Sequence, residues 1–157
     1  MKRFFPTLFF LTILVLVLAA CSTKEPPPIT GEDASPDAIP DLVGTYSLNG
    51  IDPRGEEYGG LLAIEAGTEQ GEYQMQWIVT GAIQGGTGTV VGNQLKAEWR
   101  NLEGMEMEVN GNVIYTITTK GELYGTRTAD GYEGEGIERA FPNDDMWGDF
   151  HLGPQVK

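Results

Sequence analysis

The chain has 157 residues, of which 23 are acidic and 10 are basic, and its formal net charge is −13 at pH 7. A surface with this charge repels phosphate backbones and anionic lipid headgroups. The charge therefore argues against nucleic acid as a partner and against membrane binding through basic side chains. The sequence has a single cysteine, so it cannot form an internal disulfide or a metal site of paired cysteine ligands.

The first 20 residues have the pattern of a secretory signal peptide. Two basic residues come near the start, residues 4–18 are mostly apolar, and two alanines then precede Cys21. The apolar run is shorter than the roughly 20 residues that a transmembrane helix needs. We therefore predict that residues 1–20 are removed on export and contribute nothing to the fold.

The sequence Leu-Ala-Ala-Cys at positions 18–21 resembles the lipobox of bacterial lipoproteins. This resemblance implies that Cys21 becomes the lipid-modified N-terminus and that the chain is a lipoprotein anchored at the cell envelope. Several acyl chains on one residue hold it firmly, since each buried CH2 contributes about 0.8 kcal/mol. Ser22, rather than an aspartate, follows the cysteine, which implies the outer membrane if the source is Gram-negative.

Residues 21–40 are expected to be a linker that follows the lipidated cysteine. Proline, small and acidic residues dominate this stretch, and it has no apolar period. The run Pro26 to Pro28 favours a stiff, extended polyproline segment. The linker is expected to be disordered and to hold the folded domain away from the bilayer.

Residues 41–141 are predicted to form a single all-β domain. Apolar and polar residues alternate in several runs, for example where Leu95, Ala97 and Trp99 are expected to face inward. Turn sequences such as Asn110-Gly111 recur about every ten residues. The expected strands span residues 42–50, 57–66, 72–80, 83–91, 94–101, 104–109, 112–119, 122–128 and 132–139.

Short antiparallel strands joined by tight turns predict a meander that closes into a small barrel of eight or nine strands. Closure removes the exposed edges that a flat meander would leave. An eight-stranded barrel has an interior that side chains can fill or that can hold one small ligand. Five aromatic residues are therefore candidates either for lining a ligand cavity or for packing the core. They are Tyr46, Tyr73, Trp77, Trp99 and Tyr115.

The order of glycines and aromatics resembles a family of small exported bacterial β-barrel proteins of uncharacterised role, some of which are labelled fibronectin-binding. The resemblance is carried by motifs such as Tyr58-Gly59-Gly60-Leu61, Gly121-Glu122-Leu123-Tyr124-Gly125 and Gly136-Ile137-Glu138. In architecture the chain is also similar to the avidin and lipocalin barrels. Arg127 departs from the pattern, because an aromatic residue is expected there. The resemblance supplies no catalytic residues.

The sequence contains no recognisable catalytic motif, and we predict that the protein is not an enzyme and uses no cofactor. Its only histidine, His151, lies outside the predicted barrel, which leaves no Ser-His-Asp triad there. A carboxylate-dependent hydrolase that uses Glu98, Glu133 and Glu135 is the weakest alternative.

No metal site is predicted either. Residues 105–108 contain two methionines that could bind a soft metal, but a strand with buried methionines is favoured. Asp130 and the two glutamates that follow it could bind calcium, although a solvated acidic hairpin explains them better.

The predicted function is a non-catalytic binding or interaction module at the cell envelope, with an unknown protein or small molecule as partner. The alternative is a lipocalin-like carrier of a small ligand. Residues 142–157 form a tail in which Trp147 and Phe150 either pack on the barrel, lie in a disordered end or bind a partner.

Overall fold

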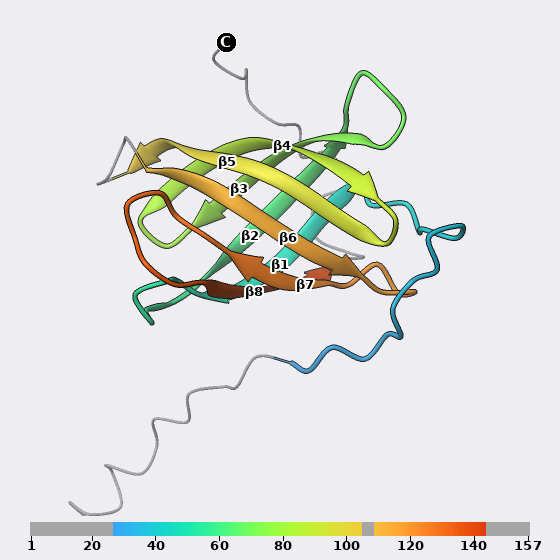
Figure 1. Ribbon diagram of the computed structural model, residues 1–157, viewed down its shortest axis with the longest axis horizontal. Helices are drawn as coiled ribbons and strands as arrows, with labels where there is room; N and C mark the ends of the chain where they lie inside the picture. Colours follow the sequence, from blue (N-terminus) through green and yellow to red (C-terminus); the bar gives the residue numbers. More distant parts are fainter. Residues whose placement is uncertain (1–26, 105–108, 144–157) are drawn as a thin grey trace, which may run out of the picture.

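The computed structural model describes residues 27–104 and 109–143, and these residues form a closed barrel of eight antiparallel strands (Figure 1). Each strand pairs with the next, and β1 pairs with β8 to close the barrel. The strands are β1 (Gly44–Ile51), β2 (Glu57–Ala66), β3 (Glu72–Val79), β4 (Ala82–Val91), β5 (Gln94–Gly104), β6 (Asn110–Ile117), β7 (Leu123–Arg127) and β8 (Gly136–Pro142). The prediction of an all-β meander that closes into a barrel is confirmed. Within the described ranges there is no helix that could cross a lipid bilayer.

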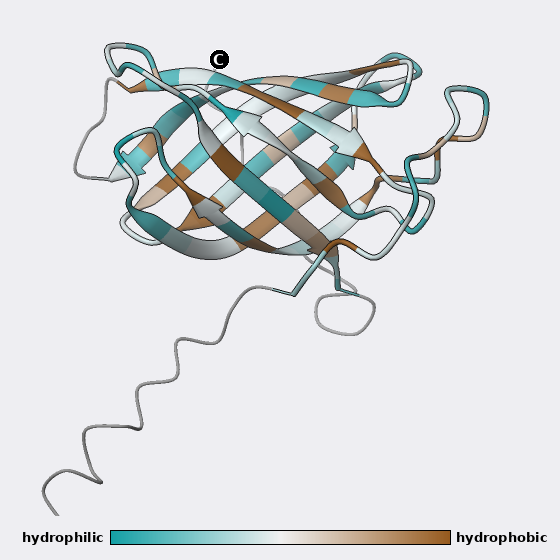
Figure 2. Cartoon of the chain, turned by 60° about the horizontal axis from the view of Figure 1, so that its bottom comes forward, coloured by the Kyte–Doolittle hydropathy of each residue, from teal (hydrophilic) through white to brown (hydrophobic). Residues whose placement is uncertain are grey.

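Alternation along the strands separates the interior of the barrel from its surface (Figure 2). In β5, Leu95, Ala97 and Trp99 are buried, whereas Lys96 and Glu98 between them are exposed. The same period of burial recurs in β6 and β8. Burial of one large apolar side chain contributes about 1.5–3 kcal/mol. The fully buried apolar side chains are Leu42, Leu62, Met75, Trp77, Leu95, Tyr115, Ile117, Leu123 and Ala140.

The structure corrects the predicted boundary between the fifth and sixth strands. Asn110-Gly111 was expected to be a turn, but both residues belong to β6, where Gly111 pairs with Trp99. A side chain at Gly111 would collide with the carbonyl oxygen of Thr128, so this glycine permits close approach of two segments and not a turn. The strand expected over 104–109 lies largely outside the described residues, and the barrel closes with eight strands.

The N-terminal segment, residues 30–43, packs against the barrel at the end where β1 begins (Figure 1). Gly31 N donates to Glu122 Oε2 at 2.7 Å, and Ala34 N donates to Ile117 O at 2.8 Å. Ala34 and Leu42 are 3% and 0% exposed and belong to the hydrophobic core. The expected free linker over 21–40 therefore differs from the structure from Thr30 onward, because these residues bury apolar groups and satisfy barrel-end hydrogen bonds.

The two ends of the barrel are therefore different. The closed end is the one covered by the N-terminal segment, beside the turn at residues 118–122. The open end carries the connections β1–β2, β3–β4 and β7–β8, at residues 52–56, 80–81 and 128–135. A pocket opens at this second end.

Candidate functional site: a buried polar cluster below an open pocket

A buried ion pair lies inside the barrel toward the open end. Arg127, the last residue of β7, donates from Nη1 to Glu138 Oε1 of β8 at 2.8 Å, and their side chains are 5% and 0% exposed. Glu138 also accepts hydrogen bonds from the hydroxyl groups of Tyr58, at 2.6 Å, and Tyr115. Three donors thus satisfy one carboxylate in the interior, which is the condition under which a buried charge is tolerated.

Glycines on the neighbouring strands create the space for this cluster. Glu138 pairs across the sheet with Gly50 of β1 on one side and with Gly125 of β7 on the other. Tyr58 and Tyr115 occupy the next positions outward, opposite those two glycines. Because the glycines have no side chain, both tyrosines reach across them to the same carboxylate. The register therefore forms a row Tyr–Gly–Glu–Gly–Tyr across five strands.

The protonation states of the cluster follow from this packing. Burial first, and then the Glu138 carboxylate, raise the pKa of Tyr58 and of Tyr115, so both phenols remain protonated donors. Burial alone would lower the pKa of Arg127, but the charge and hydrogen bond of Glu138, together with Tyr58 and Tyr115, outweigh burial and the pKa is raised. Arg127 therefore stays a cation at any physiological pH.

Aromatic and amide side chains fix the guanidinium of Arg127 from other directions. Its central carbon lies 3.9 Å from the centre of the Trp99 ring and 5.7 Å from that of Trp77. Nη2 of Arg127 donates to Gln84, whose own amide donates to Asn101 at 2.8 Å. The cation is thus held in one orientation before any ligand arrives.

A pocket of about 420 Å3 opens above this cluster at the open end. This volume lies within the range of about 300–1,000 Å3 that is typical of small-ligand sites. Toward the interior it is lined by Tyr58, Gln84, Trp99, Asn101 and Arg127. Toward solvent its rim is formed by Asp52, Arg54, Glu56, Glu57 and Tyr132. The pocket combines aromatic walls with a charged floor and a mainly acidic rim.

The five aromatic candidates divide between the two ends. Trp99 lines the pocket, whereas Trp77 and Tyr115 are fully buried below it, joined by a hydrogen bond of 3.1 Å from Nε1 to Oη. Tyr46 is buried near the closed end and donates to Leu42 O at 2.8 Å. Tyr73 is half-buried and packs against the core. Of the five candidates, Trp99 thus lines the pocket, and the other four lie in the core or against it.

Most of the pocket was not predicted from the sequence, although signals for it were present. Arg127 was noted only as a departure from an expected aromatic. It follows Leu123 and Gly125 on the inward face of β7, and a charge on an inward face indicates a buried partner. Tyr58 and Glu138 were quoted within glycine motifs without a role. Gln84 and Asn101 carried no signal, since amides are common in strands that face water.

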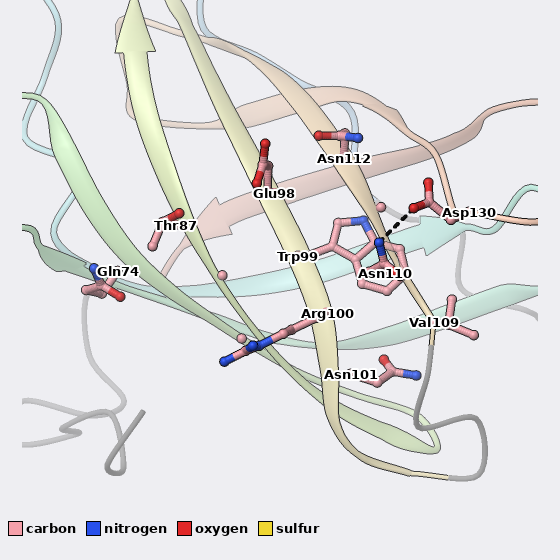
Figure 3. A pocket seen from close by; sticks show the side chains of 13 residues that line it. Gln74, Thr87, Glu98, Trp99, Arg100, Asn101, Val109, Asn110, Asn112 and Asp130 are labelled. Carbon is pink, nitrogen blue, oxygen red and sulfur yellow. Dashed lines mark hydrogen bonds between the residues drawn. The ribbon is translucent and has the colours of Figure 1, made fainter. Parts of the chain in front are cut away.

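A second hollow, a polar groove of about 750 Å3, crosses the outer face of β4, β5 and β6 (Figure 3). Thr87, Glu98 and Asn112 line it and are exposed. Of the three carboxylates considered for a hydrolase, Glu98 lies in this groove, and Glu133 and Glu135 are exposed in the β7–β8 connection. Among the described residues no three acidic, histidine or cysteine side chains are arranged to hold a metal ion. The methionines considered for a soft metal, and the tail aromatics, lie outside the described residues.

Comparison with known proteins supports the fold alone. No protein-family model matches the sequence, and no curated protein matches it. Among solved structures, the chain is similar to a redesigned β-barrel, mFAP1, bound to DFHBI, with a TM-score of 0.53 and 14% identity over 65% of this chain and 94% of that one. It is also similar to a de novo designed fluorescence-activating β-barrel, with a TM-score of 0.50 and 11% identity over 64% of this chain and 93% of that one. The chain is therefore an eight-stranded antiparallel barrel that resembles designed barrels, one of which holds a small molecule.

Proposed function

We propose that this protein is a non-catalytic binding protein that holds a small ligand in the pocket at the open end of its barrel. The observation that carries the proposal is the buried Arg127, which lines the pocket at 5% exposure while Glu138, Gln84 and Trp99 fix its orientation. A buried ion pair is often no more stabilising than apolar side chains of similar volume, so its position at the floor of a pocket favours a recognition role. A preformed, immobile donor also lowers the conformational entropy that the protein loses on binding.

Binding is favoured over catalysis because the interior carboxylate of Glu138 is fully buried and is not among the residues that line the pocket. Glu138 receives three hydrogen bonds, from Arg127, Tyr58 and Tyr115. A general base needs an accessible lone pair within hydrogen-bond reach of the substrate proton. Here the carboxylate holds the arginine and the two tyrosines in place instead.

The proposal includes the cell envelope as the location, through lipid on Cys21. Eight residues separate Cys21 from Thr30, which is bound to Glu122 at the closed end. An extended chain of this length spans at most roughly 30 Å. A lipidated Cys21 would thus hold the closed end near the membrane and leave the pocket facing away from it.

The test of ligand binding compares one substitution at two ends of the barrel. Ala129 is half-buried and lines the pocket, whereas Ala66 is exposed at the closed end of β2. Native mass spectrometry of the protein purified from its own envelope should reveal a bound small molecule in the wild type and in Ala66→Phe. Ala129→Phe, which fills the pocket, should lose it. Equal retention by both variants, or an unliganded wild type that also binds no member of a chemically diverse library of small molecules, would overturn the proposal.

The location is tested separately with Cys21→Ser. The wild-type protein should partition into detergent and carry the added mass of lipid on its N-terminal residue. The variant should carry no lipid mass and should keep residues 1–20, because the lipid-directed peptidase requires the modified cysteine. A wild-type chain of unmodified mass would refute the anchor and leave the ligand-binding proposal untouched.

A further inference from the structure

The floor of the pocket offers hydrogen-bond donors. Arginine has five N–H donors and no acceptor. In the part of the chain that the structure describes, Glu138 accepts from Nη1 of Arg127 and Gln84 accepts from Nη2. The guanidinium thus retains donors beyond these two bonds where it lines the pocket. The inner end of a ligand must therefore present an acceptor, either a neutral carbonyl or a carboxylate.

The walls favour a planar body between the floor and the rim. Tyr58, Trp99 and Tyr132 all line the pocket, and Tyr132 is 37% exposed at its mouth. Aromatic rings stack with other flat groups at a low cost in conformational entropy. One face of the Arg127 guanidinium is already covered by Trp99, so a ligand meets this cation at its edge and not over its face.

The rim decides between a neutral and an anionic acceptor. Three carboxylates stand there, Asp52, Glu56 and Glu57, against the single cation of Arg54. Arg54 is engaged by Asp52 at 2.9 Å and by Glu56 at 3.5 Å. The floor adds no net charge, since Glu138 balances Arg127. A carboxylate would thus enter a pocket of net negative charge in a chain that is already strongly acidic, which is unfavourable.

Resting on the proposed function, we infer that the ligand is a small planar molecule that offers a neutral carbonyl to Arg127 and carries a cationic group at the acidic rim. The carbonyl end satisfies the floor without adding negative charge. The cationic end lies among Asp52, Glu56 and Glu57, where it replaces part of the rim's solvation with favourable charge interactions. Anionic relatives of the same molecule are rejected by the rim even though Arg127 could receive them.

The inference is tested with three benzamides that carry a group of different charge opposite the carbonyl. They are 4-(aminomethyl)benzamide, 4-methylbenzamide and 4-carbamoylbenzoate, which are cationic, neutral and anionic. Ligand-observed NMR titration at low salt should give affinities in that order, with about tenfold between the first and the last, as expected for two or three partly exposed charge contacts. Raising the salt concentration should reduce the differences in affinity between the three probes.

Two double variants test whether the rim carboxylates cause the dependence of affinity on the charge of the probe. Glu56→Gln with Glu57→Gln removes two rim charges and should bring the three affinities within about twofold of one another. Glu69→Gln with Glu72→Gln removes the same charge beside the closed end and should preserve the order. Equal binding of the three probes, tighter binding of the anion, or binding by none of them overturns the inference. The proposed function is judged independently, by the comparison of Ala129→Phe with Ala66→Phe.

Discussion

The closed end and the open end of this barrel bury different kinds of side chain. At the closed end, Leu42 and Ala34 from the N-terminal segment join an apolar core, and Glu122 fixes that segment from the edge. Toward the open end, the interior instead contains the Arg127–Glu138 pair and its tyrosine partners. Apolar burial stabilises directly, whereas a buried ion pair is often no better than an apolar replacement. The comparison indicates that apolar stabilisation is concentrated at the closed end, and the proposed recognition site lies at the open end.

The largest expected effect comes from breaking the ion pair. Glu138→Gln should lower the free energy of unfolding by about 3–5 kcal/mol, because it leaves Arg127 buried without its counter-charge. The double variant Arg127→Met with Glu138→Met should recover much of that loss and bind no ligand. Urea denaturation of the three proteins separates these effects. A double variant that is no more stable than the single one would mean that the ion pair is a main source of stability. The open end would then stabilise the fold as the closed end does.

The closed end is tested by Leu42→Ala, which should cost about 2–5 kcal/mol because it opens a cavity in a fully buried position. Val43 is the matched control, since it is the next residue and is 50% exposed. Val43→Ala should change the unfolding free energy by less than about 0.5 kcal/mol. Ligand affinity should be unchanged in both variants. A comparably small effect at Leu42 would show that the N-terminal segment contributes little to the fold.

The alternation of apolar residues was enough to predict the barrel but not its polar interior. In β5 the buried side chains are the apolar ones, so the pattern and the fold agree. In β8 the pattern is misleading, because Ile137 is 46% exposed while Glu138 is 1% exposed. The partners of Glu138 lie 11 to 80 residues away and are brought together only by the closed register. No local property of the sequence contains that information.

The N-terminal segment shows a second limit of sequence interpretation. Its proline-rich, acidic composition is typical of a linker, and only a few of its residues are apolar. Those few include Ala34, which is nevertheless buried, and Ile39, which packs against the core. A segment can dock through two or three anchors and main-chain hydrogen bonds without any periodic pattern. Composition alone therefore could not distinguish a docked segment from a free one.

Acid should release the N-terminal segment through Glu122. Burial raises the pKa of this carboxyl, but hydrogen bonds from Gly31 and Thr30 outweigh it and hold the pKa below its usual value of 4.5. A lowered pKa means that the ionised carboxylate stabilises the fold above about pH 4.5, and that this contribution is lost as the pH falls through the lower folded-state pKa.

The matching variant is Glu122→Gln, which should cost about 1.5–3 kcal/mol at pH 7, as expected for hydrogen bonds to a charged group. The difference in unfolding free energy between the wild type and this variant should shrink as the pH is lowered below 4.5. Denaturation curves at several pH values measure it. A difference that stays constant with pH would show that the ionised carboxylate is not what holds the segment.

The smallest expected change in stability, and the most informative one for the open end, is Gly50→Ala. A methyl group at Gly50 would collide with the ring of Tyr58, which crosses this glycine to reach Glu138. Overpacking of this kind costs about 1–3 kcal/mol, and here it also shifts a residue that lines the pocket. Gly59→Ala is the control, because the nearest atom to its added methyl group would be 3.6 Å away. Ligand affinity should fall in Gly50→Ala and stay unchanged in Gly59→Ala. If Gly50→Ala loses stability but keeps its affinity, Tyr58 supports the fold and takes no part in recognition. The residues that bind the ligand would then lie nearer to the mouth of the pocket than Tyr58.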